Sequence, residues 1–203
     1  MNVSIIGAGN VGRALASSIS RAGHDVTIAA KHREHAEKAA GEIDAKAAAD
    51  AASAVDDADI IVLAVPFGGA DEVAREIGDR VAGKTIIDVT NPLKPDYSGL
   101  ATENTSAAEE LQQKLPDANV VKAFNTIFAS NQANPSRAID GFVAGDDAKA
   151  KQQVISLVDS IGFTPVDVGP LSSARYLEGM AYINIGLNAQ NGWAWTSAWK
   201  LER

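Results

Sequence analysis

Residues 2–12 read NVSIIGAGNVG, and the pattern in this stretch indicates the class of fold. The apolar run 2–6 is rich in β-branched residues and stops at Gly7, while apolar residues at helical spacing begin at Val11. A strand that passes through a glycine turn directly into a helix is the opening of a βαβ unit. A further apolar run at residues 25–29 supplies the second strand of that unit.

The turn between this strand and helix matches the pattern G-x-G-x-x-G at Gly7, Gly9 and Gly12. In that context the first glycine makes the tight turn, the second lets a pyrophosphate approach the backbone, and the third lets helix and strand pack closely. Free N–H groups at the start of the helix, around Asn10 and Val11, attract the pyrophosphate. We therefore predict a dinucleotide-binding site.

The rest of the chain repeats the alternation of strand and helix. Further strands are predicted at residues 59–65, 84–89, 119–123, 141–145 and 162–168, and helices at residues 33–40, 69–78, 107–115, 149–160 and from 172 onward. We predict a single α/β domain over residues 1–203, with a Rossmann-type, doubly wound, mainly parallel sheet. Its nucleotide-binding core covers about residues 1–124, and a small C-terminal helical lobe covers about 125–203.

The composition excludes much side-chain chemistry. The chain has no cysteine, and its three histidines all lie within the first 35 residues. A structural metal site, a thiolate nucleophile, a triad with a late histidine and a disulfide framework are therefore not expected. A net charge of -8 also argues against a nucleic-acid partner, because such binding depends on neutralising phosphates with Lys and Arg.

The N-terminus shows no secretory signal, so we expect a cytoplasmic protein. Residues 179–199 contain no charge, which meets the length criterion for a membrane span, but Asn184, Asn188, Gln190 and Asn191 argue against one. We expect a helix through this stretch that packs on the domain or against a second subunit of a homodimer. The helical spacing of Asn184, Asn188 and Asn191 places them on one face. That face lines the pocket of a redox acceptor or forms a polar outer face.

The end of the second strand favours NADP(H) over NAD(H). An NAD site usually places Asp or Glu there to bind the ribose hydroxyls, whereas this chain has Lys31, His32 and Arg33, and no carboxylate before Glu34. In an acidic chain, three adjacent basic residues at this junction are suited to bind a 2'-phosphate through charge-assisted hydrogen bonds.

No residue pattern supplies the proton donor that carbonyl reduction needs. None of Tyr97, Tyr176 and Tyr182 is followed by Lys four residues later. Lys94 and Lys122 remain, and each is expected to be solvated. A flavin or deazaflavin ring takes up its own proton, so the protein needs only to position two rings against each other. We therefore expect a small-molecule redox acceptor of this kind and assign no residue as acid or base.

Three segments that follow predicted strands are candidates for positioning the rings. They should meet at the carboxyl edge of the sheet, where ligands of such folds bind. The segments are Ala64-Val65-Pro66-Phe67, Thr90-Asn91-Pro92-Leu93 and Ala123-Phe124-Asn125-Thr126.

With these features assembled, the chain resembles the NADP oxidoreductases that depend on the deazaflavin coenzyme F420, and the related nucleotide-binding domain of the STEAP metalloreductases. The resemblance covers nearly the whole length. It rests on IIGAGNVGRALA, the basic run at 31–33, IVLAVPF, DVTNPL, SAAEELQQKLP, VVKAFNT, VAGDD and VDVGPLSSARYLE.

The resemblance implies NADPH at residues 7–12, with the basic run near its 2'-phosphate. It also implies nicotinamide near Pro66 and Asn91, an acceptor ring packed over it, and a homodimer. Asn125 stands where archaeal deazaflavin enzymes have a histidine, which leaves the acceptor open. The alternatives are an NADPH-dependent reductase of an imine or another small molecule, and an NADPH-binding sensor without turnover.

Overall fold

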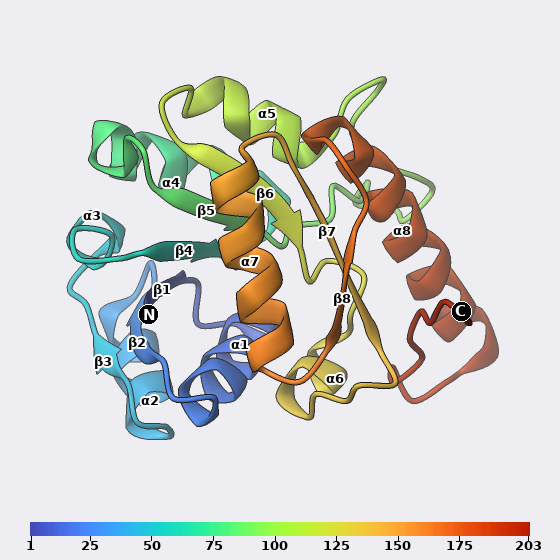
Figure 1. The fold of residues 1–203 in the computed structure, drawn as a ribbon, viewed down its shortest axis with the longest axis horizontal. Coiled ribbons are helices and arrows are strands. Elements are labelled where there is room, and N and C mark those ends of the chain that lie inside the picture. The colour runs from blue at the N-terminus through green and yellow to red at the C-terminus, as the bar shows by residue number, and fades with distance from the viewer.

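The computed structural model describes residues 1–203 and contains one eight-stranded sheet in the order β3-β2-β1-β4-β5-β6-β7-β8 (Figure 1). The strands are β1 (Asn2–Ile6), β2 (Asp25–Ala29), β3 (Lys46–Ala47), β4 (Ile60–Leu63), β5 (Thr85–Asp88), β6 (Asn119–Ala123), β7 (Asp140–Gly145) and β8 (Thr164–Asp167). All neighbouring strands pair in parallel except β6 and β7, which are antiparallel. The predicted Rossmann-type, mainly parallel sheet is confirmed.

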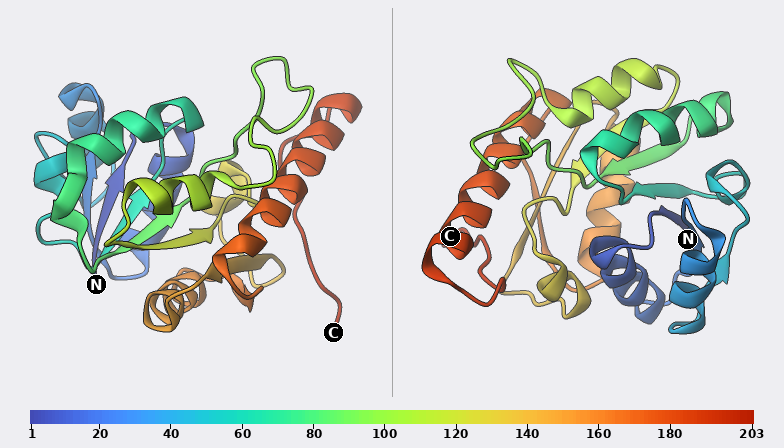
Figure 2. Two further views of the ribbon diagram at one scale, coloured as in Figure 1. Left: turned by 90° about the horizontal axis from the view of Figure 1, so that it is seen from above. Right: turned by 180° about the vertical axis from the view of Figure 1, so that it is seen from behind.

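Helices cover both faces of the sheet (Figure 2). The helices are α1 (Asn10–Arg21), α2 (Arg33–Gly41), α3 (Ala51–Ala54), α4 (Ala70–Ile77), α5 (Ala107–Lys114), α6 (Ala129–Ala133), α7 (Ala148–Ser160) and α8 (Ala174–Asn191). One apolar core lies between the sheet and α1, α2 and α7, and a second lies between the sheet and α3, α4 and α5. A small third cluster joins Phe142 and Ala144 of β7 to Leu177 of α8.

The continuous apolar runs of the central strands follow from this double cover. In β4, Ile60 and Val62 belong to the first core, whereas Ile61 and Leu63 belong to the second. Successive side chains of a strand point to opposite faces, so a strand buried on both sides is apolar at every position. The strands predicted at 59–65 and 84–89 therefore lie where the sequence placed them, with shorter bounds, and the strand predicted at 119–123 has the predicted bounds.

Three short elements, β3, α3 and α6, were not predicted, because runs of two to five residues are too short to show a period. The capping pattern at Ser106 is present in part. The Ser106 hydroxyl accepts from the Glu109 N–H at 3.1 Å and donates to the Glu109 carboxylate at 2.8 Å. In a full capping box the Glu109 carboxylate would accept from the Ser106 backbone N–H. Here it accepts from the Ser106 hydroxyl instead.

Helix α8 lies beyond the β7–β8 edge of the sheet, beside the loop of residues 92–105 (Figures 1 and 2). The prediction of a helix up to residue 199 was wrong, because α8 ends at Asn191 with Gly192 in the left-handed conformation. The following residues, 193–203, form a tail without helix or strand, which we call the C-terminal tail. No helix of the structure has the length and apolar character needed to cross a membrane.

The C-terminal tail is held by hydrogen bonds along its length. Asn131 of α6 donates to the Thr196 carbonyl at 3.0 Å, and Asn188 of α8 donates to the Ser197 hydroxyl at 2.6 Å. Further along, the buried carboxylate of Asp140 accepts from the Leu201 N–H at 2.6 Å and forms an ion pair with Lys200 at 3.1 Å.

Candidate dinucleotide and acceptor site

The glycine turn after β1 is required by close packing at two of its three glycines. Gly7 has φ of +119°, and a Cβ atom there would lie 2.1 Å from the Ala64 carbonyl oxygen. A Cβ atom on Gly12 would lie 1.8 Å from the Gly7 carbonyl oxygen. Both distances are far below van der Waals contact, so β1, α1 and the end of β4 reach this arrangement only with glycine at both positions.

The middle glycine of the motif, Gly9, faces open space. A Cβ atom on Gly9 would meet nothing within 4 Å, and Gly9 caps α1 with no side-chain hydrogen bond. The N–H groups at the start of a helix lack partners within the helix and attract anions. The open cradle over Gly9, with Asn10 and Val11 as the first residues of α1, therefore fits a pyrophosphate.

The basic run follows β2, which lies next to β1 in the sheet. Lys31, His32 and Arg33 are all exposed, and His32 caps the start of α2 without a side-chain hydrogen bond. Lys31 pairs with Glu72 at 3.0 Å, and Arg33 pairs with Glu37 at 2.8 Å. Exposed ion pairs of this kind are weak, so a phosphate could replace both carboxylates.

The three predicted segments at the sheet edge follow β4, β5 and β6, which are neighbours in the sheet. Asn91 Nδ2 donates to the Asn125 main-chain carbonyl at 3.0 Å, and Asn125 Nδ2 donates to Asn91 Oδ1 at 2.9 Å. A main-chain carbonyl can only accept, so this pairing fixes the orientation of both amide groups. Pro66 is exposed at the end of β4, whereas Pro92 and Ala123 are buried.

A cavity of about 180 Å³ opens beside the paired carboxamides. Its walls come from the start of α1, the ends of β5 and β6, α6 and α8. The lining residues are Val11, Val89, Asn91, Phe124, Asn125, Thr126, Ile127, Phe128, Ala129, Gln132, Ala181, Asn184 and Ile185. We call this space the sheet-edge cavity. Its polar lining consists of four carboxamides and one hydroxyl, all uncharged.

The late helix supplies one of the three asparagines expected on a common face. Asn184 lines the sheet-edge cavity, but Asn188 is buried against the C-terminal tail, and Asn191 is exposed. Asn184 and Asn188 do share a face, because Asn188 Nδ2 lies 3.3 Å from Asn184 Oδ1 and both side chains bond the Ser197 hydroxyl. That face meets the C-terminal tail as well as the cavity. Gln132, Ala181 and Ile185 also line the cavity and were not predicted, since nothing local in the sequence distinguishes them.

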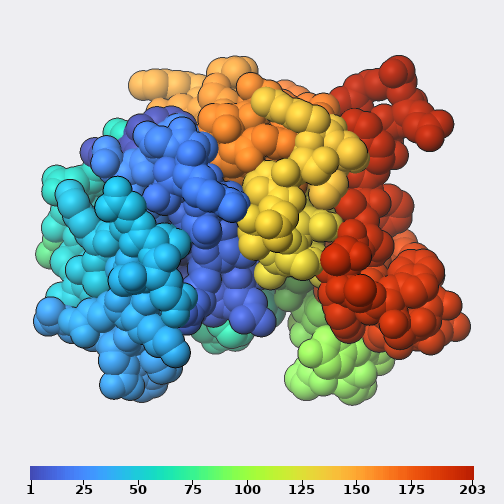
Figure 3. Space-filling model, turned by 90° about the horizontal axis from the view of Figure 1, so that it is seen from below, coloured from blue at the N-terminus to red at the C-terminus, as the bar shows by residue number.

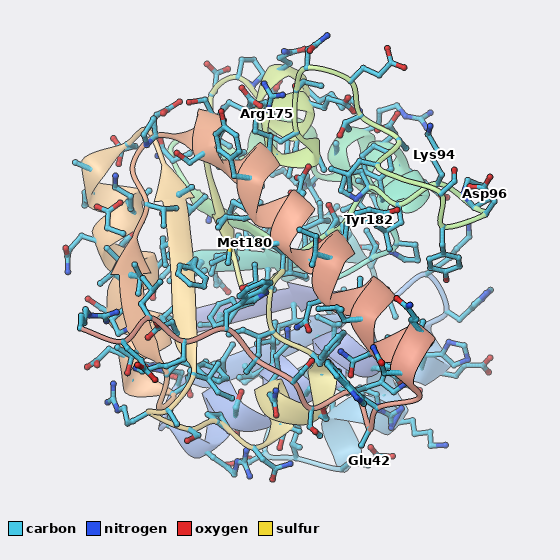
Figure 4. All side chains as sticks on the ribbon, turned by 90° about the vertical axis from the view of Figure 1, so that its right-hand side faces the viewer. Glu42, Lys94, Asp96, Arg175, Met180 and Tyr182 are labelled. Carbon is cyan, nitrogen blue, oxygen red and sulfur yellow. The ribbon has the colours of Figure 1, made fainter.

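The expectation of a solvated Lys122 was wrong. Its side chain is fully buried and contacts Asp88 at 2.8 Å, Glu178 at 2.8 Å and the Thr90 carbonyl at 2.6 Å. A buried ammonium group is stable only with such partners. Lys94, by contrast, is exposed on the loop of residues 92–105 beside α8, as expected (Figure 4).

A larger cavity of about 760 Å³ lies at the opposite edge of the sheet, at the amino ends of β1 and β2. Asn2, Asp25 and Asp57 are among its lining residues. Ligands of doubly wound sheets bind at the carboxyl ends of the strands, so size alone does not make this space the site.

From below, the surface of the molecule is hollowed between its N-terminal part and the loop of residues 92–105 (Figure 3).

Comparison with known proteins shows the family of this chain. The family model described as "NADP oxidoreductase coenzyme F420-dependent" matches residues 2–92. The F420-dependent NADP reductase of Methanothermobacter thermautotrophicus is 31% identical over 210 residues, which span 94% of this chain and 90% of that protein. The chain belongs to the F420-dependent NADP reductase family. This is a family of NADP-dependent oxidoreductases.

Two other relatives extend the comparison of this family member. Metalloreductase STEAP3 of Rattus norvegicus is 33% identical over 87% of this chain, but the chain spans only 35% of that protein. A solved structure from Arthrobacter sp. FB24, described as a "putative f420 dependent nadp-reductase", has 28% identity and a TM-score of 0.88, and the alignment covers 99% of both chains.

Proposed function

We propose that this protein transfers hydride between NADP(H) and a deazaflavin (coenzyme F420) or flavin acceptor. NADP(H) would supply the hydride at its nicotinamide ring, and the acceptor ring would take up its own proton. The observation that carries the proposal is the lining of the sheet-edge cavity, where every polar side chain is a carboxamide or a hydroxyl. Such a lining can orient a ring but donates no proton at neutral pH, so it suits an acceptor that needs no acid.

In this proposal, the backbone from Gly7 to Gly12 holds the pyrophosphate. The basic residues Lys31, His32 and Arg33 hold the 2'-phosphate. The open space over Gly9 and the uncapped start of α1 support the first assignment. The exposed ion pair of Lys31 with Glu72 supports the second, because a doubly charged phosphate competes well for a solvated ammonium group.

The residues proposed to position the nicotinamide and the acceptor are Pro66, Asn91 and Asn125, with Ala64, Val65, Pro92 and Ala123 as the backbone around them. The reciprocal hydrogen bonds of Asn91 and Asn125 support this role, because they hold the loops after β5 and β6 in one fixed geometry. Asn125 Oδ1 has no protein partner and is left as an acceptor.

Stopped-flow mixing of the protein and NADPH with oxidised coenzyme F420, FMN or FAD tests the proposal. Loss of NADPH absorbance together with bleaching of one ring is the expected result. If NADPH binds and none of the three rings is reduced, the proposed acceptor class is wrong. The same measurement with imines would then test the alternative of a small-molecule reductase.

We also propose a homodimer. The exposed side of α8 and the tail carry Tyr176, Ile183, Leu187 and Trp193, and monomers rarely expose such a group of apolar side chains. Light scattering should give twice the 21.1 kDa mass of the chain. A monomer mass would contradict this proposal without bearing on hydride transfer.

A further inference from the structure

Three buried charged residues lie within three positions in the chain of residues that line the sheet-edge cavity, and they take no part in the proposed chemistry. Lys122 of β6 has 0% exposure, Asp88 of β5 has 1%, and Glu178 of α8 has 0%. The three N–H bonds of the Lys122 ammonium group are all used, by Asp88 Oδ2, Glu178 Oε1 and the Thr90 carbonyl oxygen. We call these three residues the buried ionic cluster.

Each member of the buried ionic cluster adjoins a different wall of the cavity. Asp88 directly precedes the lining residue Val89, and Thr90, whose carbonyl accepts from Lys122, stands between Val89 and Asn91. Lys122 precedes the lining residue Phe124 by two positions in the chain. Glu178 precedes the lining residue Ala181 by three positions, which is about one turn of α8. The cluster therefore joins the ends of β5 and β6 to α8.

The Glu178 carboxylate makes a further connection. The same Oε1 atom that accepts from Lys122 also accepts from the N–H of Ala107 at 3.0 Å. Ala107 is the first residue of α5, which follows the loop of residues 92–105. One carboxylate of α8 is thus bonded both to the central sheet and to the helix that ends this loop.

Helix α8 depends on this cluster for its position because its buried side contains little apolar surface. Its buried residues are Ala174, Leu177, Glu178, Ala181, Asn184 and Asn188, so one leucine and two alanines supply the apolar part of its buried side. Leu177 packs in a small cluster with Phe142 and Ala144 of β7. Apolar burial is proportional to area and does not specify direction. The hydrogen bonds that Glu178 accepts from Lys122 and from the Ala107 N–H are directional, so they can specify where this part of the helix lies.

The remaining carboxylate oxygen indicates that Glu178 is costly to bury. Glu178 Oε2 is buried without a partner. Burial raises the pKa of Glu178 above its usual range, although the Lys122 ammonium group opposes that shift. A group that is costly to bury and nevertheless reaches the core points to a role in specific positioning rather than in general stability.

We propose that Glu178 is a positioning residue of the acceptor site, which acts through Lys122 to fix the wall that α8 contributes to the sheet-edge cavity. This inference rests on the proposed function, because it takes that cavity as the place of the acceptor ring. The same role joins three of the sequence motifs, DVTNPL, VVKAFNT and VDVGPLSSARYLE, which contain Asp88, Lys122 and Glu178 respectively.

The test compares Glu178→Ala with Glu178→Gln, which retains an oxygen able to accept from Lys122 and from the Ala107 N–H. Steady-state kinetics with whichever of coenzyme F420 or FMN the wild type reduces should show the acceptor KM raised about tenfold or more in Glu178→Ala. The NADPH Kd should change by less than about twofold, and Glu178→Gln should restore most of the acceptor KM. Leu177→Ala, which removes apolar packing from the adjacent residue of the same helix, serves as the matched control and should leave the acceptor KM near its wild-type value.

Three outcomes would overturn the proposal. Glu178→Ala could change NADPH and acceptor binding equally, or leave the acceptor KM unchanged, or Leu177→Ala could show the same acceptor defect. If Glu178→Ala does not fold, the comparison is made between Glu178→Gln and Glu178→Asp, and the shorter carboxylate should raise the acceptor KM more than the isosteric amide. If the wild type reduces no ring, hydride transfer itself fails. Hydrogen exchange then decides this inference separately: faster exchange at residues 181–185 in Glu178→Ala, with α1 unchanged, supports it, and unchanged exchange overturns it.

Discussion

The two ends of the candidate site are built by different means. The dinucleotide end consists of backbone, with Gly7 and Gly12 in tight contact and Gly9 facing open space. The acceptor end consists of side chains from segments far apart in the sequence, such as Asn91, Asn125 and Asn184. A backbone site is specified within a few consecutive residues, whereas a side-chain site exists only after strands, loops and α8 have packed. The five predictions below test this contrast.

The largest effect is expected from Lys122→Met. This change leaves the carboxylates of Asp88 and Glu178 buried without their shared cation, so the free energy of unfolding should fall by about 3–5 kcal/mol. Urea denaturation measures this loss. Lys94→Met, at an exposed lysine, should stay within about 0.5 kcal/mol of the wild type. Equal stability of the two variants would mean that Lys122 is not held as the structure describes.

Gly12→Ala and Gly9→Ala should separate packing from binding at the backbone end. The Cβ atom of Gly12→Ala would lie 1.8 Å from the Gly7 carbonyl oxygen, so α1 must shift, at a cost of about 1–3 kcal/mol in stability. Gly9→Ala meets nothing within 4 Å and should unfold like the wild type. Thermal melts with and without NADPH should show that Gly9→Ala has lost mainly the stabilisation by NADPH. If Gly9→Ala lowered the melting temperature in the absence of NADPH, this assignment would be contradicted.

Lys31→Glu should weaken NADPH binding about tenfold to a hundredfold, because it replaces a charge-assisted hydrogen bond to phosphate with repulsion. Binding of NADH, which lacks the 2'-phosphate, should change little. Fluorescence titration with both dinucleotides gives the ratio. Lys38→Glu makes the same change of charge in the last turn of α2 and should leave the ratio near that of the wild type. Equal losses for NADPH and NADH in Lys31→Glu would place the phosphate elsewhere.

Glu72→Gln should strengthen NADPH binding by about twofold to fivefold. The Glu72 carboxylate lies 3.0 Å from the Lys31 ammonium group, and an exposed pair of this kind contributes only a fraction of a kcal/mol to about 1 kcal/mol. Removing its charge frees Lys31 for the phosphate. Isothermal titration of both proteins with NADPH measures the change, and weaker binding by the variant would show that Glu72 does not compete.

The smallest effect is expected at acid pH in the C-terminal tail, which contains all three tryptophans. Burial acts to raise the pKa of Asp140, but the Leu201 N–H with Lys200 and Arg203 outweighs it and holds that pKa below its usual range. A lowered carboxylate pKa stabilises the attached tail above the unfolded pKa, and that stability is lost as pH falls through the folded pKa. Tryptophan emission should therefore shift at acid pH, and Asp140→Asn should show the shifted emission already at neutral pH.

The contrast between the two ends also explains how much the sequence could predict. The strand, turn and helix around Gly7 are consecutive, so their pattern predicted the fold class, which is confirmed, and the dinucleotide site, which stays a prediction. The central strands were equally clear, because burial on both faces makes most of their positions apolar. The exposed Lys31, His32 and Arg33 were found at the end of β2, since strand ends can be located from the same pattern.

The acceptor end could be predicted only in part. Asn91 and Asn125 were expected at the same sheet edge, and their hydrogen bonds confirm that they meet. Lys122 was misjudged because its partner Glu178 lies 56 residues further along the chain, and no local pattern indicates that distance. Gln132 was missed because α6 has only five residues, too few to show which side faces a cavity.

The reciprocal bonding of Asn91 and Asn125 has a consequence for the cost of binding. Loops that are free before a ligand arrives lose conformational entropy when it binds, which subtracts from affinity. Here the loops after β5 and β6 are already joined to each other, so that ordering is completed during folding. A ring entering the cavity would meet walls that are already set, and its affinity would depend on contacts made rather than on loops brought to order.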